Sequence, residues 1–124
     1  MKDGKFSITK WEETSAEPLP APMKFNRGRV ERLHSGVLEG TEVMQYTFLY
    51  SDDTRSEFVG IGIFEGSVAG VSGRFAVIER GSYVDGAAHT VFDVRDLASD
   101  LSVSLGTGEY STSEHVDVGY VFTS

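Results

Sequence analysis

The chain has 124 residues, no cysteine and a formal net charge of -8 at pH 7. Its length predicts a single domain over residues 1–124, and the lack of cysteine excludes disulfides, thiolate chemistry and thiolate-bound metal clusters. An acidic surface repels phosphate backbones, so we expect no nucleic-acid partner and interpret one basic group as solvated strand surface: Lys24, Arg27, Arg29 and Arg32.

The first half of the chain has the pattern of extended strands joined by turns. Residues 1–10 lack the apolar segment of a signal peptide and no apolar run reaches membrane-spanning length, so we expect a cytoplasmic protein with no membrane partner. Alternating apolar and polar residues predict a strand over 5–13, and prolines at every second position predict a loop over 14–22. The later segments are strands over 24–35 and 41–50, a bend at 36–40 and a turn at 51–54.

The second half continues this pattern. The predicted segments are strands over 55–66, 74–83 and 88–97, a short strand and turn at 67–73, a turn at 84–87, and a helical turn with a short strand within 98–113. A last strand over 115–124 places Val116, Val118, Tyr120 and Phe122 on one face. Short strands at even intervals predict an all-β fold, an antiparallel up-and-down barrel of about eight strands.

The stretch FVGIGIFEGSVAGVSGRF, residues 58–75, has enough glycine to raise the question of a phosphate-binding loop. Such a loop needs a helix directly after its glycines, whereas β-branched residues surround Gly60 and Gly62 and no helical pattern follows. We therefore interpret the stretch as strands. Gly60 and Gly62 share a face with Phe58 and Phe64, and this alternation of large and absent side chains suits a tapered barrel interior.

Several spaced segments resemble one family of small bacterial proteins. They are HSGVLEGTEVMQY, FVGIGIFEGSVAGVSGRFAVIERGSYVDG and GTGEY. The residues that carry the resemblance are Gly36, Glu39, Gly40, Tyr46, Phe58, Gly60, Phe64, Gly66, Gly73, Phe75, Gly81 and Gly86. The family is domain of unknown function 3224, and the resemblance spans residues 6–122. It implies a calycin-like antiparallel barrel related to allene oxide cyclase and an oligomer, but no established reaction and no catalytic residues.

Aromatic residues are the strongest candidates for a ligand site. Tyr46, Phe48 and Tyr50 share one strand face, Phe58 and Phe64 share another, and a plain packed core is the alternative interpretation. Glu39 and Glu65 are added to these candidates because each lies where an apolar strand meets a turn. The candidate ligand-binding residues are Glu39, Tyr46, Phe48, Tyr50, Phe58, Phe64 and Glu65. Most of the strand carboxylates are expected to face water, and those outside the candidate set are Glu42, Glu57, Glu79 and Asp93.

Other chemistries find no support in the sequence. The histidines, His34, His89 and His115, are interpreted as ordinary strand residues, so we expect no metal site and no cofactor. His89 and Asp93 share a face of one predicted strand, but they are four residues apart along it. That spacing corresponds to roughly 13 Å, too far for a hydrogen-bonded pair. The serine of GVSG precedes a strand rather than a helix, so it is no nucleophile elbow.

These features favour a protein that binds a small apolar ligand in the interior or mouth of a barrel. One alternative, implied by the resemblance, is a cofactor-independent isomerase or cyclase of the allene oxide cyclase type. A second is a structural module that assembles through an outer apolar face. Both faces of strand 58–64 are apolar, so we expect a homo-oligomer, either a dimer or a trimer.

Overall fold

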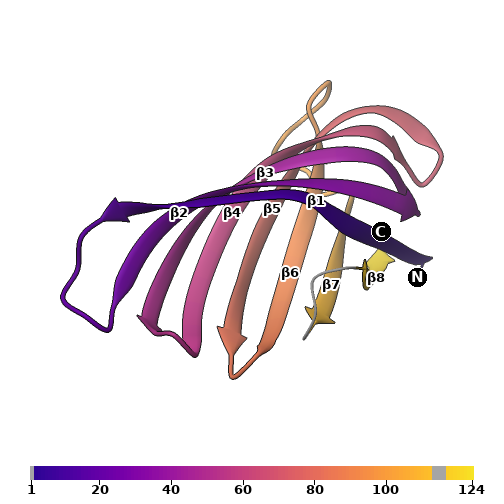
Figure 1. Cartoon of the computed structure of the whole chain (residues 1–124). Helices are drawn as coiled ribbons and strands as arrows, with labels where there is room; N and C mark the ends of the chain where they lie inside the picture. The colour runs from indigo at the N-terminus through magenta and orange to yellow at the C-terminus, as the bar shows by residue number, and fades with distance from the viewer. Residues whose placement is uncertain (1, 113–116) are drawn as a thin grey trace.

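The computed structural model describes residues 2–112 and 117–124, and its strands form one closed antiparallel barrel (Figure 1). The strands are β1 (Lys2–Glu17), β2 (Lys24–Gly36), β3 (Leu38–Asp52), β4 (Arg55–Val68), β5 (Val71–Val84), β6 (Ala87–Asp96), β7 (Gly106–Thr112) and β8 (Asp117–Thr123). Each strand pairs with the next, and β8 returns to pair with β1. The prediction of an all-β antiparallel barrel is confirmed as a closed ring of eight strands.

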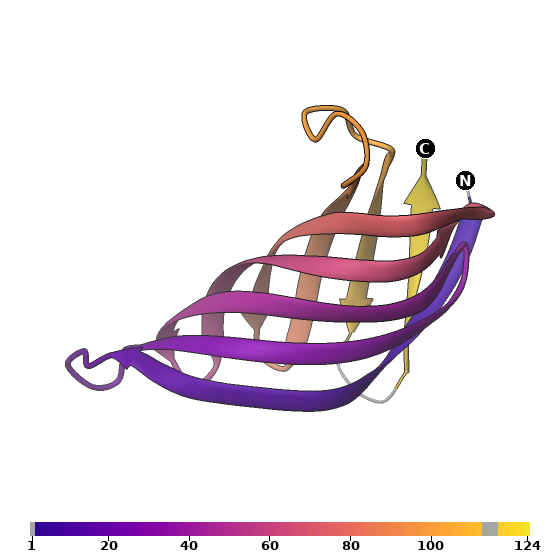
Figure 2. The same cartoon turned by 90° about the horizontal axis from the view of Figure 1, so that it is seen from above.

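The connections alternate between the two ends of the barrel (Figures 1 and 2). One end carries the connections β1–β2, β3–β4 and β5–β6, and the other carries β2–β3, β4–β5, the longer segment 97–105 and both termini. Strand β1 continues past its predicted end at residue 13, because its backbone pairs with β2 as far as Glu17 and Phe25. The loop is therefore confined to residues 18–23.

Segment 97–105 differs from the prediction of a helical turn. It contains isolated turns, in which the amides of Ser99 and Val103 donate to the carbonyls of Asp96 and Asp100. Within the described residues, no helix is long and apolar enough to cross a membrane.

Glycine on one strand makes room for a ring from the next. A Cβ atom at Gly60 would lie 2.5 Å from the ring of Tyr46, and one at Gly81 would lie 2.5 Å from the ring of Phe58. Since real Cβ atoms do not approach so closely, the rings lie flat across these glycines and the interior can hold many aromatic side chains. Gly60 on β4 and Gly81 on β5 thus make room for rings from the neighbouring strands.

The outer face of β4 and β6 is apolar at several positions. Val59, Ile61 and Val91 are each more than half exposed, at 54%, 58% and 52%. Val59 and Ile61 belong to the second apolar face noted for strand 58–64, and a second copy of the chain covering that face stays a prediction.

Candidate ligand-binding site

A cavity of about 410 Å³ occupies part of the barrel interior. It is lined by Phe6, Ile8, Trp11, Arg32, Tyr46, Phe48, Tyr50, Ser56, Phe58, Tyr83, Ala88, Thr90, Tyr110, Thr112 and Val118. Several of these residues, such as Trp11, Tyr50 and Tyr83, lie on the strand segments next to the β1–β2, β3–β4 and β5–β6 connections. The cavity therefore belongs to that end of the barrel. We call the interior around it the open half, and the packed interior around Leu38, Phe64, Phe75 and Phe122 the closed half.

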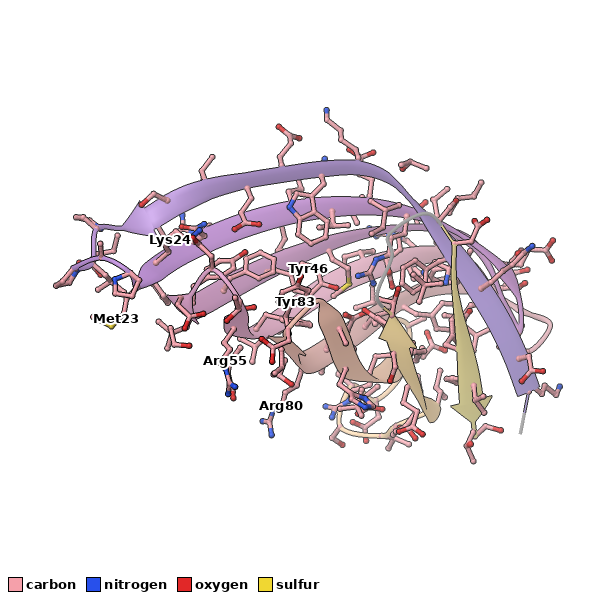
Figure 3. The ribbon with its side chains drawn as sticks, turned by 60° about the horizontal axis from the view of Figure 1, so that its bottom comes forward. Met23, Lys24, Tyr46, Arg55, Arg80 and Tyr83 are labelled. Atoms are coloured by element: carbon pink, nitrogen blue, oxygen red, sulfur yellow. The ribbon has the colours of Figure 1, made fainter. Side chains whose placement is uncertain are left out.

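The walls of the cavity are aromatic. Alternation along β3 turns Tyr46 and Phe48 inward, and Phe58 on the paired strand β4 meets both rings at centroid distances of 5.7 and 5.9 Å. Trp11 of β1 stacks on Phe48 at 5.9 Å. Figure 3 shows Tyr46 within the barrel, whereas Arg55 and Arg80 point away from it. Rings from three strands thus form one continuous apolar surface.

Polar contacts fix the rim of the cavity. One oxygen of the Glu13 carboxylate accepts hydrogen bonds of 2.7 Å from Asn26 Nδ2 and from the Tyr50 hydroxyl, and the other accepts one of 3.2 Å from Trp11 Nε1. The ammonium of Lys24 lies 4.7 Å from the centre of the Tyr50 ring. Burial and the bond to Glu13 raise the pKa of Tyr50, which keeps this phenol a hydrogen-bond donor at neutral pH.

The floor of the cavity is built around one buried arginine. Nη1 of Arg32 donates to Glu42 Oε1 at 3.2 Å and to Glu79 Oε2 at 2.8 Å. Nη2 donates to the hydroxyls of Tyr46 at 2.5 Å and Tyr110 at 3.3 Å. All five side chains are at least nine-tenths buried, so these charged groups depend on one another for compensation.

The network extends from the floor into the closed half. The Tyr46 and Tyr110 hydroxyls donate to Glu79 Oε1 at 2.5 and 3.0 Å. His34 Nε2 lies 3.1 Å from Glu42 Oε1, and His34 Nδ1 lies 3.2 Å from the Tyr120 hydroxyl. Side chains from β2, β3, β5, β7 and β8 therefore meet in one hydrogen-bonded layer across the barrel.

Burial and charge oppose each other in shifting the pKa of Glu42, whereas burial and the Glu79 charge shift the pKa values of Tyr46 and Tyr110 in the same direction. Burial alone would raise the pKa of Glu42, but the hydrogen bond from His34 and the charge of Arg32 outweigh it, and the pKa lies below its ordinary value. Burial and the nearby Glu79 charge raise the pKa of Tyr46 and Tyr110. At neutral pH the floor thus combines an ionised glutamate with protonated phenols.

Two polar groups of the floor lack a hydrogen bond to the protein. Arg32 Nε and the Thr90 hydroxyl are both buried and unpaired within the part of the chain that the structure describes. Thr90 lies close enough to Tyr110 to lower the pKa of that phenol, which burial nevertheless raises overall. The two hydroxyls do not form a hydrogen bond of good geometry.

The predicted candidates fall into two groups. Tyr46, Phe48, Tyr50 and Phe58 line the cavity together. Phe64 is fully buried in the closed half, where its ring meets His34 edge-on at 5.4 Å.

Both glutamates of the candidate set are exposed and lie next to the connections at the other end of the barrel. Glu65 pairs with Arg74 at 3.1 Å. The structure does not bring Glu39 and Glu65 to the cavity.

Sequence reasoning missed the charged floor. The interpretation of Arg32 as solvated strand surface was wrong, since the residue is 5% exposed. Glu42 and Glu79 are exceptions to the expectation that most strand carboxylates face water, because they are 2% and 3% exposed. The signal that could have found them is strand parity: Arg32 lies two positions from Val30, and Glu42 lies two positions from Met44.

His89 is not part of the floor. His89 is exposed and its Nδ1 lies 2.9 Å from the Ser111 hydroxyl, while His115 lies outside the described residues. Within 2–112 and 117–124, no three histidine, aspartate or glutamate side chains are grouped in a way that could hold a metal ion.

Comparison with known protein families places the chain in one of them. No curated protein sequence matches it. Residues 2–123 match the family described as "Protein of unknown function (DUF3224)", so the resemblance to this family is confirmed over nearly the whole chain. The relation to allene oxide cyclase stays a prediction. The chain belongs to the DUF3224 family.

Proposed function

We propose that this protein binds a small, mainly apolar molecule in the open half of the barrel. The observation that carries the proposal is the cavity of about 410 Å³ with aromatic walls and a polar floor. Small-molecule pockets typically measure ~300–1,000 Å³ and combine apolar walls with a few well-placed polar groups. The cavity has both properties.

The aromatic walls support this proposal because part of their surface is left uncovered. Tyr50 and Phe58 are only half-buried, and Trp11 is 45% exposed although it faces Phe48. Covering apolar surface with a ligand is favourable by about 25 cal/mol per Å² before the costs of association. A ligand of matching shape would therefore gain binding free energy from the walls.

The direct test uses N-phenyl-1-naphthylamine, an uncharged probe whose fluorescence rises in apolar surroundings. The chain has one tryptophan, Trp11, and it lines the cavity. Bound probe should therefore quench Trp11 emission by energy transfer, with saturation at one probe per chain. Absence of saturable binding would contradict the proposal.

A cavity-filling variant locates the bound probe. Ala88 lines the cavity, so Ala88→Phe should abolish or strongly weaken probe binding while the barrel stays folded. Ala87→Phe is the matched control, because Ala87 is exposed and does not line the cavity. Equal probe affinity in both variants would show that binding takes place elsewhere.

A second candidate function is a cofactor-independent isomerase or cyclase of the allene oxide cyclase type. It is favoured by Tyr46 and Tyr110 at the floor, with the Glu79 carboxylate directly behind their hydroxyls. At such a site a phenol oxygen could accept a proton from a bound substrate while the phenol's own proton moves along its hydrogen bond to Glu79. Binding without chemistry is the simpler proposal, because Glu79 does not itself line the cavity.

The two functions differ in a measurable way. An isomerase site should speed deuterium exchange next to the carbonyl of an apolar ketone dissolved in D₂O, and Tyr46→Phe should remove the effect. A binding protein should retain the ketone without exchange. Nuclear magnetic resonance of the recovered ketone separates these outcomes.

A further inference from the structure

The unpaired groups at the floor indicate what a ligand must bring. Arg32 and Thr90 both line the cavity, and neither Arg32 Nε nor the Thr90 hydroxyl has a hydrogen bond to another protein group among the described residues. Both are neighbours of Tyr110: Thr90 is its partner across β6 and β7, and Nη2 of Arg32 lies 3.3 Å from its hydroxyl. A buried unpaired donor costs about 1–3 kcal/mol, which a ligand acceptor at this place would recover.

The same arginine is poorly suited to a carboxylate. Its four terminal N–H groups already donate to Glu42, Glu79, Tyr46 and Tyr110. A ligand carboxylate could not form the paired, two-bond contact that makes arginine a strong carboxylate receptor. Only the single Nε–H of Arg32 is left for a ligand.

Charge at the floor also selects against anions. Glu42 and Glu79 are both bonded to the guanidinium of Arg32, so this one cation already serves two buried carboxylates. A further negative charge in this buried place would be repelled and would lose its hydration. A cation gains little, because neither carboxylate lines the cavity.

We propose that the ligand carries an uncharged oxygen acceptor, such as a ketone carbonyl, at its buried end, bound by the Thr90 hydroxyl and Arg32 Nε. This inference rests on the proposed function, since it concerns a ligand of the same cavity. The ligand class is thus an apolar, ring-containing ketone or a similar neutral oxygen compound. Free carboxylic acids of the same skeleton are discriminated against.

The test compares three compounds of nearly equal size and shape: 2-ethylnaphthalene, 2-acetylnaphthalene and 2-naphthoate. Each is measured by competition with N-phenyl-1-naphthylamine and by calorimetry. 2-Acetylnaphthalene should bind about tenfold tighter than 2-ethylnaphthalene, the equivalent of one recovered buried hydrogen bond. 2-Naphthoate should bind more weakly than 2-acetylnaphthalene.

A variant assigns the preference to the floor. Thr90→Val replaces a buried unpaired hydroxyl by a methyl group of the same shape, so the fold should be as stable as before or slightly more stable. In this variant the preference for the acetyl over the ethyl compound should fall several-fold. Thr107→Val is the control, since Thr107 is exposed on β7, and it should keep the full preference.

The outcomes separate this inference from the proposed function. If 2-ethylnaphthalene displaces the probe but the acetyl compound binds no tighter, the cavity binds apolar molecules and the inference about the acceptor is wrong. The inference is also wrong if 2-naphthoate binds tightest or if Thr90→Val keeps the full preference. If none of the three compounds displaces bound probe, the inference is wrong, whereas the proposed function fails only if N-phenyl-1-naphthylamine itself does not bind.

Discussion

The open and closed halves of the barrel interior use the same kinds of side chain but are filled to different degrees. In the closed half, Leu38, Phe64 and Phe75 are almost completely inaccessible to solvent. In the open half, Tyr50 and Phe58 keep part of their surface uncovered around the cavity. The closed half resembles an ordinary protein core, whereas the open half has the character of a pocket.

The layer around Arg32 explains why the two halves differ. Arg32, Glu42 and Glu79 lie between them and are held by hydrogen bonds in a fixed arrangement. Apolar side chains of the open half do not pack tightly against this layer, because apolar atoms offer its charged groups no hydrogen-bond partners and burying those groups against them costs free energy. We therefore expect substitutions in the closed half to affect mainly stability and substitutions in the open half to affect mainly the proposed ligand binding.

Alkaline pH should have the largest effect, because it breaks the layer that separates the halves. The pKa values of Tyr46, Tyr110 and Tyr120 are raised, first of all by burial. Their stabilisation is complete below the unfolded value of about 10 and is lost as the pH rises towards the folded values. Tyrosinate absorbance and far-ultraviolet circular dichroism should change together in one cooperative step. Ionisation of all the phenols with the barrel intact would contradict the prediction.

Arg32→Met should destabilise the barrel by about 3–5 kcal/mol, since it leaves two buried carboxylates without their cation. Denaturant unfolding measures the loss. The matched control is Arg29→Met, which removes a half-exposed arginine of the same strand and should change stability by less than ~0.5 kcal/mol. Adding Glu79→Gln to Arg32→Met should recover part of the loss. Equal losses for Arg32 and Arg29 would show that the layer is not structural.

A pair of phenylalanine substitutions compares the halves directly. Phe64→Ala opens a hole in the closed half and should cost about 3–5 kcal/mol with little direct effect on the probe site. Phe58→Ala removes a half-buried cavity wall, so it should cost less stability but weaken probe binding several-fold. Unfolding and probe titration are measured on both variants. If the two variants lose stability and probe affinity in the same proportion, the two halves do not differ in their roles.

Gly60→Ala should have the smallest effect on stability, about 1–3 kcal/mol, because the new methyl group must push the Tyr46 ring aside. Moving that ring also distorts the floor, so probe affinity should fall. Gly119→Ala is the control, since its Cβ would meet only the Gly4 carbonyl at 4.0 Å. If Gly60→Ala is as mild as the control, the ring does not depend on this glycine.

Much of the fold could be predicted from local patterns. Alternation along residues 41–50 turns Met44, Tyr46 and Phe48 to one face whatever the rest of the chain does, because successive strand residues point to opposite sides. The same parity places Arg32 with Val30. The rule that charged residues face water led to the wrong interpretation of Arg32, and burial proved possible because its partners share the interior.

The sequence by itself determined the strands, the face on which each side chain lies and membership of the family. Only the tertiary structure decided that Arg32 meets Glu79, 47 positions further along the chain, and that Trp11 stacks on Phe48. It also decided that the interior contains a cavity. The physical reason is that parity acts within one strand, whereas contacts across a barrel and the space left between them depend on how all the strands close around a common interior.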